Sequence, residues 1–367
     1  MKISVQRNQL LAPLQVAHAV VERRQTLPIL ANVLLTANAD GFRLSATDLE
    51  VELSVSGTLE ACLTGGATTL PARKLLDLCR AMPDDTLLAL EAGGERAAIR
   101  AGRSRFSLAT LPATEFPGID VKGEAFEIEL PQRDLRRAIE ATHFAMAQQD
   151  VRYYLNGMLL EIDHGRVRLV ATDGHRMAVT DLALTVAPEL SRRIIVPRKT
   201  VIEALRLLTD DDTPALLGVG QDHLTLAAAD VVFKSKVIDG SFPDYERVIP
   251  RHQDKVLDVD RLGLRDALGR VAIFANEKYR SVRLQLEPNL LRLSANNAEN
   301  EEGEEELEVS YGGSALEIGF NVSYLIDVLT ALRGERVRLH LSDAGSSCLI
   351  TEPDGGAHRY VIMPMRL

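Results

Sequence analysis

The chain has 367 residues and a formal charge of −10, with 46% hydrophobic and 26% charged residues. Its length is two to three times the usual domain size and its composition is that of ordinary globular proteins, which excludes a stapled mini-protein and a disordered or collagenous chain. Aromatic residues make up only 4% and Trp is absent, so extended stacking of bases on aromatic side chains is not expected.

The N-terminal segment carries no signal of export, and the cysteines favour a reducing compartment. No apolar stretch follows the basic start of the chain, and no run reaches the ~18 apolar residues of a membrane span. Cys62, Cys79 and Cys348 are an odd number, far apart, and have no CxxC spacing. We expect a cytoplasmic protein with reduced, partly buried thiols.

In chain order, six segments predict amphipathic helices. In 2–20, 126–144 and 255–274 a short alternating strand runs into the helix, whereas the other three have a polar or Pro start followed by apolar residues at helical spacing. The segments are 2–20 (KISVQRNQLLAPLQVAHAV), 70–82 (LPARKLLDLCRAM), 126–144 (FEIELPQRDLRRAIEATHF), 196–208 (VPRKTVIEALRLL), 255–274 (KVLDVDRLGLRDALGRVAIF) and 320–332 (FNVSYLIDVLTAL).

The sequence resembles itself at a shift of about 125 residues. FRLSATDLEVELSV (42–55), VRLVATDGHRMAVTDL (167–182) and LRLSANNAENEEGEEELEVSY (291–311) share an apolar alternation and then a polar pair. Within the later helices, acidic residues take equivalent places at Asp77, Glu203 and Asp327. We predict three similar domains, at residues 1–124, 125–251 and 252–367, each a duplicated strand-helix-strands unit with two helices. The fold class is therefore α+β, with antiparallel sheets and the helices on one side, although repetition alone shows only that one geometry is reused.

The charges separate between helices and strands. The six predicted helices and their flanks carry a net charge of +8, which leaves −18 for the strands and loops. If all helices lie on one face, that face is basic and suits contacts to nucleic acid phosphates without sequence specificity. The alternative is that the helix surfaces simply carry solvated arginines.

A second charge asymmetry lies between the ends of the chain. A basic cluster in the first domain is followed by apolar residues, and an acidic run in the third domain follows two further apolar residues. The head-to-tail contact between such surfaces of two copies would close a ring. The acidic run could instead be a solvated loop, and it lacks the regular ligand spacing of a carboxylate metal site. The residues are Arg96, Arg100, Arg103, Arg105, Phe106 and Leu108 in the first domain, and Ile273, Phe274 and Glu299–Glu308 in the third.

Over its entire length the chain is similar to the bacterial DNA polymerase III beta subunits, the family of beta sliding clamps that act as processivity factors. The motifs that carry the resemblance, in order, are TLPILANVLL, ATDLE, LPARKLLDLCRAM, GRSRFSLATLP, QQDVRYYLNGM, ATDGHRMAV, IVPRK, FPDYERVIP, NEKYRSVRL, GFNVSYLIDVLTAL and YVIMPMRL. The resemblance implies a DNA clamp fold and a head-to-tail homodimer that forms a ring, with the helices lining the hole. It also implies topological, sequence-independent binding of duplex and primed DNA.

The same resemblance implies three sets of site residues. DNA-contacting residues would be Arg24, Arg73, Gln149, Tyr153 and Tyr154, although both tyrosines could instead be packing residues on a strand. The dimer interface would include Lys74, Arg103, Arg105, Phe106, Leu108, Ile273, Phe274, Glu301, Glu304 and Glu305. A groove for short partner peptides would be formed by Leu155, Thr172, Gly174, His175, Arg176, Met177, Pro243, Arg247, Val248, Asn321, Tyr324, Ser347, Val361, Ile362, Met363, Pro364, Met365 and Arg366.

Partners implied by the resemblance are the clamp loader, the replicative polymerase alpha subunit, translesion polymerases and repair proteins. No P-loop, dinucleotide-binding, HExxH or GxSxG motif occurs, so we expect no enzyme activity, no cofactor and no metal. Two rival hypotheses remain from the residues alone. One is a metal-dependent nuclease or hydrolase that uses Glu299 to Glu306, and the other is a repeat scaffold that binds only proteins.

Overall fold

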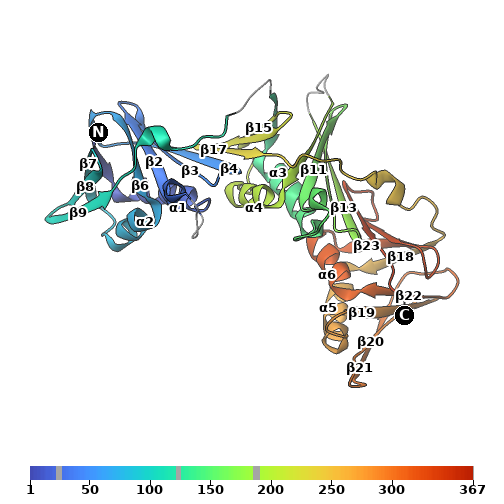
Figure 1. Ribbon diagram of the computed structural model, residues 1–367. Helices are drawn as coiled ribbons and strands as arrows, with labels where there is room; N and C mark the ends of the chain where they lie inside the picture. Colours follow the sequence, from blue (N-terminus) through green and yellow to red (C-terminus); the bar gives the residue numbers. More distant parts are fainter. Residues whose placement is uncertain (22–26, 121–124, 185–190, 367) are drawn as a thin grey trace. The chain divides into compact units, whose positions relative to one another are not determined.

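The computed structural model describes residues 1–21, 27–120, 125–184 and 191–366 (Figure 1). The chain divides into two compact units. Unit 1 consists of Met1–Arg133 and Arg206–Val237, and unit 2 consists of Asp134–Leu205 and Ile238–Leu367. Each unit holds two antiparallel sheets.

Unit 1 contains a five-stranded sheet, sheet A, and an eight-stranded sheet, sheet B. The order of sheet A is β5 (Ala61–Thr64), β1 (Lys2–Gln6), β7 (Leu87–Gly93), β8 (Arg96–Ala101) and β9 (Ser104–Ala109). The order of sheet B is β10 (Phe126–Pro131), β15 (Pro214–Val219), β16 (His223–Ala228), β17 (Val231–Lys236), β4 (Val51–Gly57), β3 (Gly41–Thr47), β2 (Asn32–Asn38) and β6 (Gly66–Pro71).

Two helices of unit 1 pack against each other and cover one side of these sheets (Figure 1). They are α1 (Arg7–His18), which contacts β3 and β4, and α2 (Ala72–Ala81), which contacts β2 and β6. The apolar residues at helical spacing that predicted α2, Leu75 and Cys79 among them, are buried. Their burial supplies most of the stability of such short helices.

Unit 2 contains an eight-stranded sheet, sheet C, and a four-stranded sheet, sheet D. The order of sheet C is β14 (Arg192–Pro197), β11 (Gly157–Asp163), β12 (Arg166–Thr172), β13 (Arg176–Ala183), β25 (His358–Ile362), β24 (Cys348–Thr351), β23 (Arg336–Leu341) and β18 (Lys255–Asp260). The order of sheet D is β21 (Glu302–Glu308), β20 (Leu290–Asn296), β19 (Ser281–Glu287) and β22 (Leu316–Asn321).

In unit 2, α5 (Arg261–Val271) and α6 (Val322–Ala331) pack together, and α5 contacts β20 and β21. Side chains cap both helices, because Asp260 accepts from the Gly263 amide at 2.6 Å and Asn321 accepts from the Ser323 amide at 2.9 Å. The remaining two α-helices of the described residues, α3 (Gln132–Glu140) and α4 (Arg198–Leu207), each cross the division between the units. Single-turn 3₁₀ helices include η3 (His143–Ala145), η4 (Tyr153–Leu155), η5 (Tyr245–Val248) and η6 (Ala272–Phe274).

The structure confirms the repeat at the level of hydrogen bonds. The polar pairs aligned in the sequence follow β3, β12 and β20, where a side-chain oxygen accepts backbone amides two to four residues further along the chain. The accepting residues are Asp48, Asp173 and Asn297. The same local turn therefore redirects the chain in each third of the sequence.

The six predicted helices, the strands predicted before three of them and the α+β class with antiparallel sheets are confirmed. Sheet B joins strands of the first and second predicted domains, and sheet C joins strands of the second and third. The two compact units therefore do not follow the predicted domain limits after residues 124 and 251, which stay predictions.

All three cysteines are free: Cys79 and Cys348 are buried, and Cys62 is half-buried. Burial raises the pKa of the Cys79 thiol to about 11, so it stays protonated at neutral pH. Within the part of the chain that the structure describes, no helix is both long and apolar enough to cross a membrane.

Candidate DNA-facing and partner-binding sites

The loop that carries Gln149 is held in shape by its own side chains. The Asp150 amide donates to Asn156 Oδ1 at 2.9 Å, and Asn156 Nδ2 donates back to the Asp150 carbonyl at 2.9 Å. Arg152 donates to both carboxylate oxygens of Asp150 at 3.0 and 2.7 Å. These hydrogen bonds lower the pKa of Asp150 to about 2. Gln149 itself is exposed and has a φ of 54°, so the loop presents its amide side chain to solvent.

Tyr153 and Tyr154 lie on the 3₁₀ turn η4, so the alternative in which both pack on a strand is wrong. Their rings meet edge to face, with 5.7 Å between centroids. Tyr153 is 56% exposed, whereas Tyr154 is partly buried against the hydrophobic cluster of sheet C. Adjacent side chains on a 3₁₀ turn are rotated about the helix axis, whereas adjacent side chains on a strand point to opposite faces of the sheet.

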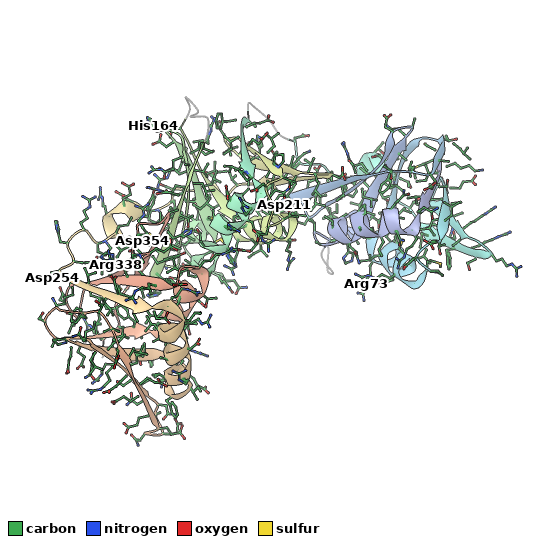
Figure 2. All side chains as sticks on the ribbon, turned by 180° about the vertical axis from the view of Figure 1, so that it is seen from behind. Arg73, His164, Asp211, Asp254, Arg338 and Asp354 are labelled. Carbon is green, nitrogen blue, oxygen red and sulfur yellow. The ribbon has the colours of Figure 1, made fainter. Side chains whose placement is uncertain are left out.

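Arg73 and Lys74 lie side by side in the first turn of α2, and both are exposed (Figure 2). Arg73 makes only a loose pair with Asp77 one turn later, with 3.8 Å between the nearest nitrogen and oxygen. Its guanidinium is therefore accessible to an anion. Arg24 falls outside the described residues.

The turn between β12 and β13, together with the strand ends beside it, carries five of the predicted groove residues. Thr172 Oγ1 donates to the Arg176 carbonyl at 2.6 Å and accepts from the Gly174 amide at 3.1 Å. Gly174 has a φ of 89°, and a Cβ on it would lie 2.9 Å from the Arg152 guanidinium. Arg152 also donates to the Asp173 carbonyl at 3.1 Å, which ties this turn to the loop of Gln149. His175 is exposed and Met177 is buried.

Arg176 connects this turn to α6. Its guanidinium donates to Asp173 at 3.1 Å, to the carbonyl of Phe144 at 2.8 Å and to the carboxylate of Asp327. It also lies 4.5 Å from the ring centroid of Tyr324. Burial raises the pKa of the Tyr324 hydroxyl, so the phenol stays neutral beside this cation.

The C-terminal segment is held by backbone hydrogen bonds on both sides. The Met363 amide donates to the His175 carbonyl at 2.9 Å, and the Met365 amide donates to the Gly319 carbonyl at 2.8 Å. Just before them, Val361 lies opposite Met177 and Ile362 opposite Arg176. Met363 is exposed, Pro364 and Met365 are half-buried and Arg366 is exposed, so the segment offers both apolar and cationic groups.

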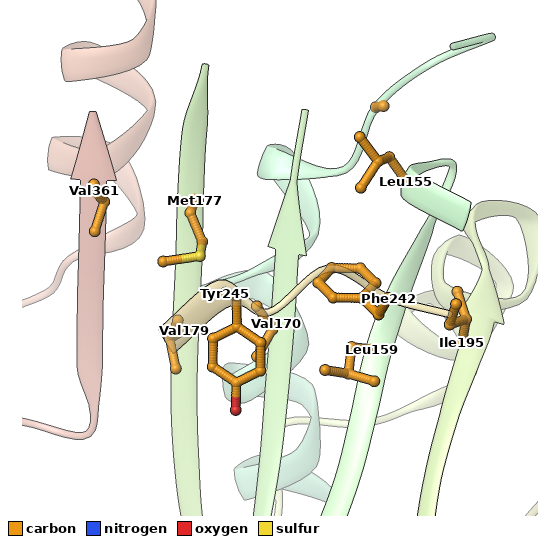
Figure 3. Packing of buried hydrophobic residues seen from close by; sticks show 10 residues of the cluster. Leu155, Leu159, Val170, Met177, Val179, Ile195, Phe242, Tyr245 and Val361 are labelled. Atoms are coloured by element: carbon orange, nitrogen blue, oxygen red, sulfur yellow. The ribbon is translucent and has the colours of Figure 1, made fainter. Parts of the chain in front are cut away.

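A hydrophobic cluster lies beneath these residues (Figure 3). It combines three predicted groove residues, Leu155, Met177 and Val361, with Phe242 and Tyr245 of the segment that connects β17 to β18. We call residues 238–249 of that segment the connector. The full cluster is Ala147, Leu155, Leu159, Val170, Met177, Val179, Ile195, Phe242, Tyr245 and Val361.

The connector also carries the groove residues Pro243, Arg247 and Val248, all of which are exposed. Arg247 pairs with Asp244 at 2.7 Å. The turn, the C-terminal segment, η4, α6 and the connector are thus brought together around one cluster. Two other groove residues make their hydrogen bonds elsewhere: Asn321 caps α6, and the Ser347 carbonyl accepts from Gln253 at 3.0 Å.

Sequence reasoning missed several residues that hold these sites in shape. They are Arg152, Asp173, Phe242 and Tyr245, and Asp327 was noted only as a repeated acidic position. Arg152 lies within the QQDVRYY motif, and Asp173 lies in the repeated polar pair. Both residues therefore lie in motifs that the sequence shows, but the motifs do not indicate which groups the two side chains contact.

Apart from Lys74, which lies on α2, the predicted interface residues of unit 1 lie on β9 and the turn before it. Arg103 and Arg105 are exposed, whereas Phe106 and Leu108 are half-buried on the alternate positions of the strand. β9 is an edge strand of sheet A, so its outer hydrogen-bonding groups face no strand of the described residues.

The predicted interface residues of unit 2 lie on β21, on η6 and, for Glu301, directly before β21. β21 is an edge strand of sheet D, and Ile273 beside it is 75% exposed. The Phe274 ring packs on Gly303, where a Cβ would lie only 2.4 Å from it. This glycine therefore makes room for the aromatic ring within the acidic strand.

Three acidic residues of β21, Glu304, Glu305 and Glu306, form ion pairs with arginines. Glu304 pairs with Arg292 at 3.1 Å, and Glu305 accepts from Arg270 at 3.0 Å. Arg270 lowers the pKa of the Glu305 carboxyl. Glu301 accepts from Asn297 at 2.7 Å. Among the described residues, no group of three or more His, Cys, Asp and Glu side chains converges as metal ligands would.

Family models match nearly the whole chain in three consecutive pieces. They describe the N-terminal, central and C-terminal domains of the DNA polymerase III beta subunit and match residues 1–120, 129–244 and 246–366. Beta sliding clamps of Pseudomonas aeruginosa and Escherichia coli K12 are 50% and 47% identical over 367 residues, which is 100% of each chain.

Solved structures agree with the sequence matches. A crystal structure of the Pseudomonas aeruginosa DNA polymerase III subunit beta has a TM-score of 0.97 at 50% identity and covers 100% of both chains. A sliding clamp of Caulobacter crescentus has a TM-score of 0.94 at 39% identity, again over 100% of both chains.

Proposed function

The chain belongs to the DNA polymerase III beta subunit family and is a DNA sliding clamp, and we propose that it encircles duplex DNA as a head-to-tail ring of two copies. A sliding clamp is a non-catalytic processivity factor that holds a replicative polymerase on DNA. It consists of three similar domains. We place its action in the cytoplasm.

The observation that carries the ring is the repeated use of one kind of strand junction. In sheet B, edge strand β4 of the first repeat pairs antiparallel with β17 of the second. In sheet C, β13 of the second repeat pairs in the same way with β25 of the third. β4 and β13 are equivalent strands, since each follows the repeated polar pair, and β17 and β25 are each the last strand of their repeat.

One strand of each type forms no junction with another repeat among the described residues. β21 follows the polar pair of the third repeat, and β9 is the last strand of the first repeat. Both lie at sheet edges. We propose that a third junction of this type forms between β21 of one copy and β9 of the next, which is a heterologous contact that closes after two copies if the arc of one copy is a half circle.

The internal junctions also predict the register of the third. An aromatic residue of the last strand lies opposite an apolar residue in both: Phe233 opposite Leu53, and Tyr360 opposite Ala178. Phe106 holds the same place on β9, because all three aromatic residues pair on their other side with a buried Ile or Leu. Those partners are Leu226, Ile350 and Ile99.

On β21 the place of Leu53 and Ala178 is taken by Gly303, one residue beyond the pair of Asn296 with Glu302. Phe106 of one copy would then lie opposite Gly303 of the other, beside the Phe274 ring that covers this glycine. Arg105 would lie opposite Glu304 on the other face of the sheet. Exposed ion pairs contribute only ~0–1 kcal/mol each, so the apolar contacts of Phe106, Leu108, Ile273 and Phe274 carry the association. Lys74, Arg103, Glu301 and Glu305 would form its charged rim.

For DNA, we propose that the duplex is contacted by Arg24, Arg73, Gln149, Tyr153 and Tyr154. The exposure of Arg73, Gln149 and Tyr153 supports this assignment. Arg73 can donate charge-assisted hydrogen bonds to phosphate and Gln149 can donate neutral ones. Contacts of this kind carry no sequence information, which suits a protein that must slide.

For partners, we propose that the groove residues bind short extended peptides of the polymerase alpha subunit, the clamp loader, translesion polymerases and repair proteins. The support is the apolar surface of Val248 and Met363 over a buried floor of Leu155, Met177 and Val361. Methionine and aliphatic side chains around a few polar groups accommodate different apolar peptides.

Disulfide trapping tests the ring. In a Cys62→Ser background, Arg105→Cys combined with Glu304→Cys should give a covalent dimer on mild oxidation, because directly opposite Cβ atoms lie within about 5.5 Å. The matched control is Arg105→Cys with Glu305→Cys, since a shift of one residue puts the sulfurs on opposite faces. Equal trapping of both pairs, or of neither, would contradict the proposed junction.

The trapped ring also tests the topological hold on DNA. The ring is loaded first and trapped by oxidation on the DNA. It should then stay on a nicked circular plasmid through a high-salt wash and leave the plasmid once this is linearised. Loss from both forms at the same rate would contradict encirclement.

A further inference from the structure

A ladder of alternating charges crosses four neighbouring strands of sheet C. Arg193, Glu161, Arg168 and Asp181 lie directly opposite one another on β14, β11, β12 and β13. Arg168 donates to both oxygens of Asp181 at 2.6 and 3.0 Å. From β25, Arg359 donates to the same carboxylate at 2.8 Å.

Arg168 is the central and most deeply buried member of the ladder, with only 4% of its surface exposed. A buried guanidinium is tolerated only where carboxylates and further acceptors satisfy its donors. Two of these acceptors come from outside the sheet. Arg168 Nη1 donates to the hydroxyl of Tyr245 at 3.1 Å and to the carboxylate of Glu246 at 3.1 Å.

Tyr245 closes the arrangement from the connector. Its hydroxyl accepts from Arg168 and donates to Glu161 Oε2 at 3.1 Å. The guanidinium carbons of Arg168 and Arg193 lie 6.0 and 5.7 Å from the centroid of its ring. The same ring is buried in the cluster that contains Met177 and Val361 (Figure 3).

These contacts fix a segment that has little structure of its own. The only helical element of the connector is the single 3₁₀ turn η5. The connector residues Pro243, Arg247 and Val248 are exposed. A 3₁₀ turn of this length is not stable alone, so its position depends on the buried side chains of Phe242 and Tyr245. The ladder also joins β13 to β25, the two strands that carry Met177 and Val361.

We propose that Arg168 and Tyr245 are positioning residues of the partner-peptide groove: the charge ladder holds the connector, and with it one wall of the groove, at a fixed place over sheet C. The inference rests on the proposed function of the groove. Neither residue need touch the peptide. Both act through Pro243, Arg247 and Val248.

The test compares Tyr245→Phe and Arg168→Met with Arg338→Met. Tyr245→Phe keeps the ring in the cluster and removes both hydrogen bonds of the hydroxyl. Arg338 on β23 is the matched control, since it makes a similar two-oxygen pair with Asp258 on β18, at 2.6 and 2.7 Å, at the opposite end of the strand order of sheet C. The probe is the purified replicative polymerase alpha subunit, and its Kd for the full-length clamp is measured by fluorescence anisotropy.

We expect the Kd to rise about three- to tenfold for Tyr245→Phe, as for the loss of a buried hydrogen bond, and more than tenfold for Arg168→Met. Arg338→Met should leave it within twofold. Hydrogen exchange should speed up in the connector in the first two variants, while the amides of β11 to β13 keep their protection. This local signature separates positioning from general destabilisation.

A Kd unchanged by Tyr245→Phe, or raised equally by Arg338→Met, would overturn the inference, and Tyr245→Phe decides alone if Arg168→Met does not fold. Deletion of Met363–Leu367, measured in parallel, separates a failure of the positioning role from a failure of the groove assignment. If that deletion weakens binding but Tyr245→Phe does not, only the positioning role is wrong. If the deletion has no effect, the groove itself is wrong.

Discussion

Glu52 on β4 and Lys234 on β17 lie directly opposite each other across the junction of sheet B, with 3.2 Å between Oε1 and Nζ. The other carboxylate oxygen of Glu52 accepts from the Ile119 amide at 2.6 Å. The side chain is mostly buried. One carboxylate therefore ties two repeats and the segment that connects them, all within unit 1.

Replacing this carboxylate should destabilise the junction. Glu52→Ala leaves the buried Ile119 amide without its acceptor, which costs ~1–3 kcal/mol. The measurement is the free energy of unfolding from urea denaturation. Glu50→Ala, at an exposed neighbouring position, is the control and should change it by less than ~0.5 kcal/mol. Equal effects of the two would show that the junction does not depend on Glu52.

The proposed DNA face predicts a defect in loading without a defect in assembly. Arg24→Ala combined with Gln149→Ala should reduce loading onto primed DNA, because phosphate contacts are lost, while the dimer persists in analytical ultracentrifugation. Loss of the cationic Arg24 contact should also lower the salt slope of binding by roughly 0.9, whereas loss of the neutral Gln149 contact should leave the slope unchanged. Arg283→Ala removes an exposed cation from β19 and should leave loading unchanged. Normal loading by the double variant would contradict the assigned face.

The proposed groove predicts that the end of the chain is needed for partners and not for the ring. Deletion of Met363–Leu367 removes the exposed Met363 but leaves β25 intact up to Ile362. Stimulation of the polymerase on a primed circular template should be abolished, and the sedimentation of the dimer should be unchanged. Stimulation at the normal level would refute the groove assignment.

Two half-buried histidines of sheet C predict how stability depends on pH. Burial lowers the pKa of His340 and of His358 below the ordinary value of 6.5. Above pH 6.5 both are neutral in the folded and the unfolded chain, and below it the unfolded chain binds protons that the folded chain does not. The free energy of unfolding should therefore decrease as the pH is lowered below 6.5, by at most about 1.4 kcal/mol per pH unit for each group.

The variant that tests this is His358→Gln, which should flatten the decline below pH 6.5. His252→Gln, at an exposed position, is its control. Urea unfolding at several pH values between 5 and 8, the range in which histidine titrates, gives the comparison. A decline of unchanged slope in His358→Gln would show that other groups cause it.

The local elements could be predicted from the sequence because each depends on short-range pattern. The helical spacing of Leu75 and Cys79 and the repeated pair of Thr172 and Asp173 are properties of a few consecutive residues. The junctions between repeats are different. The sequence of β4 does not indicate that β17 is its neighbour, since strands far apart in the chain are paired by tertiary packing.

The sites show the same division. Family motifs identified the exposed residues of the groove, such as His175 and Met363, but not the buried Arg168 and Tyr245 beneath them. Arg168 alternates with apolar residues on β12 and so has the pattern of a solvent-facing strand residue. The connector that covers it lies more than seventy residues further along the chain, so its burial was invisible to periodicity.

The absence of a peptide link at one junction has a consequence for how DNA enters. The β4–β17 and β13–β25 junctions each lie within a single chain, so strands that part there remain tethered and meet again at high effective concentration. The junction proposed between β9 and β21 has no such tether. A ring that admits an uncut duplex would then open at the contact between Arg105 of one copy and Glu304 of the other, and not at a junction within one chain.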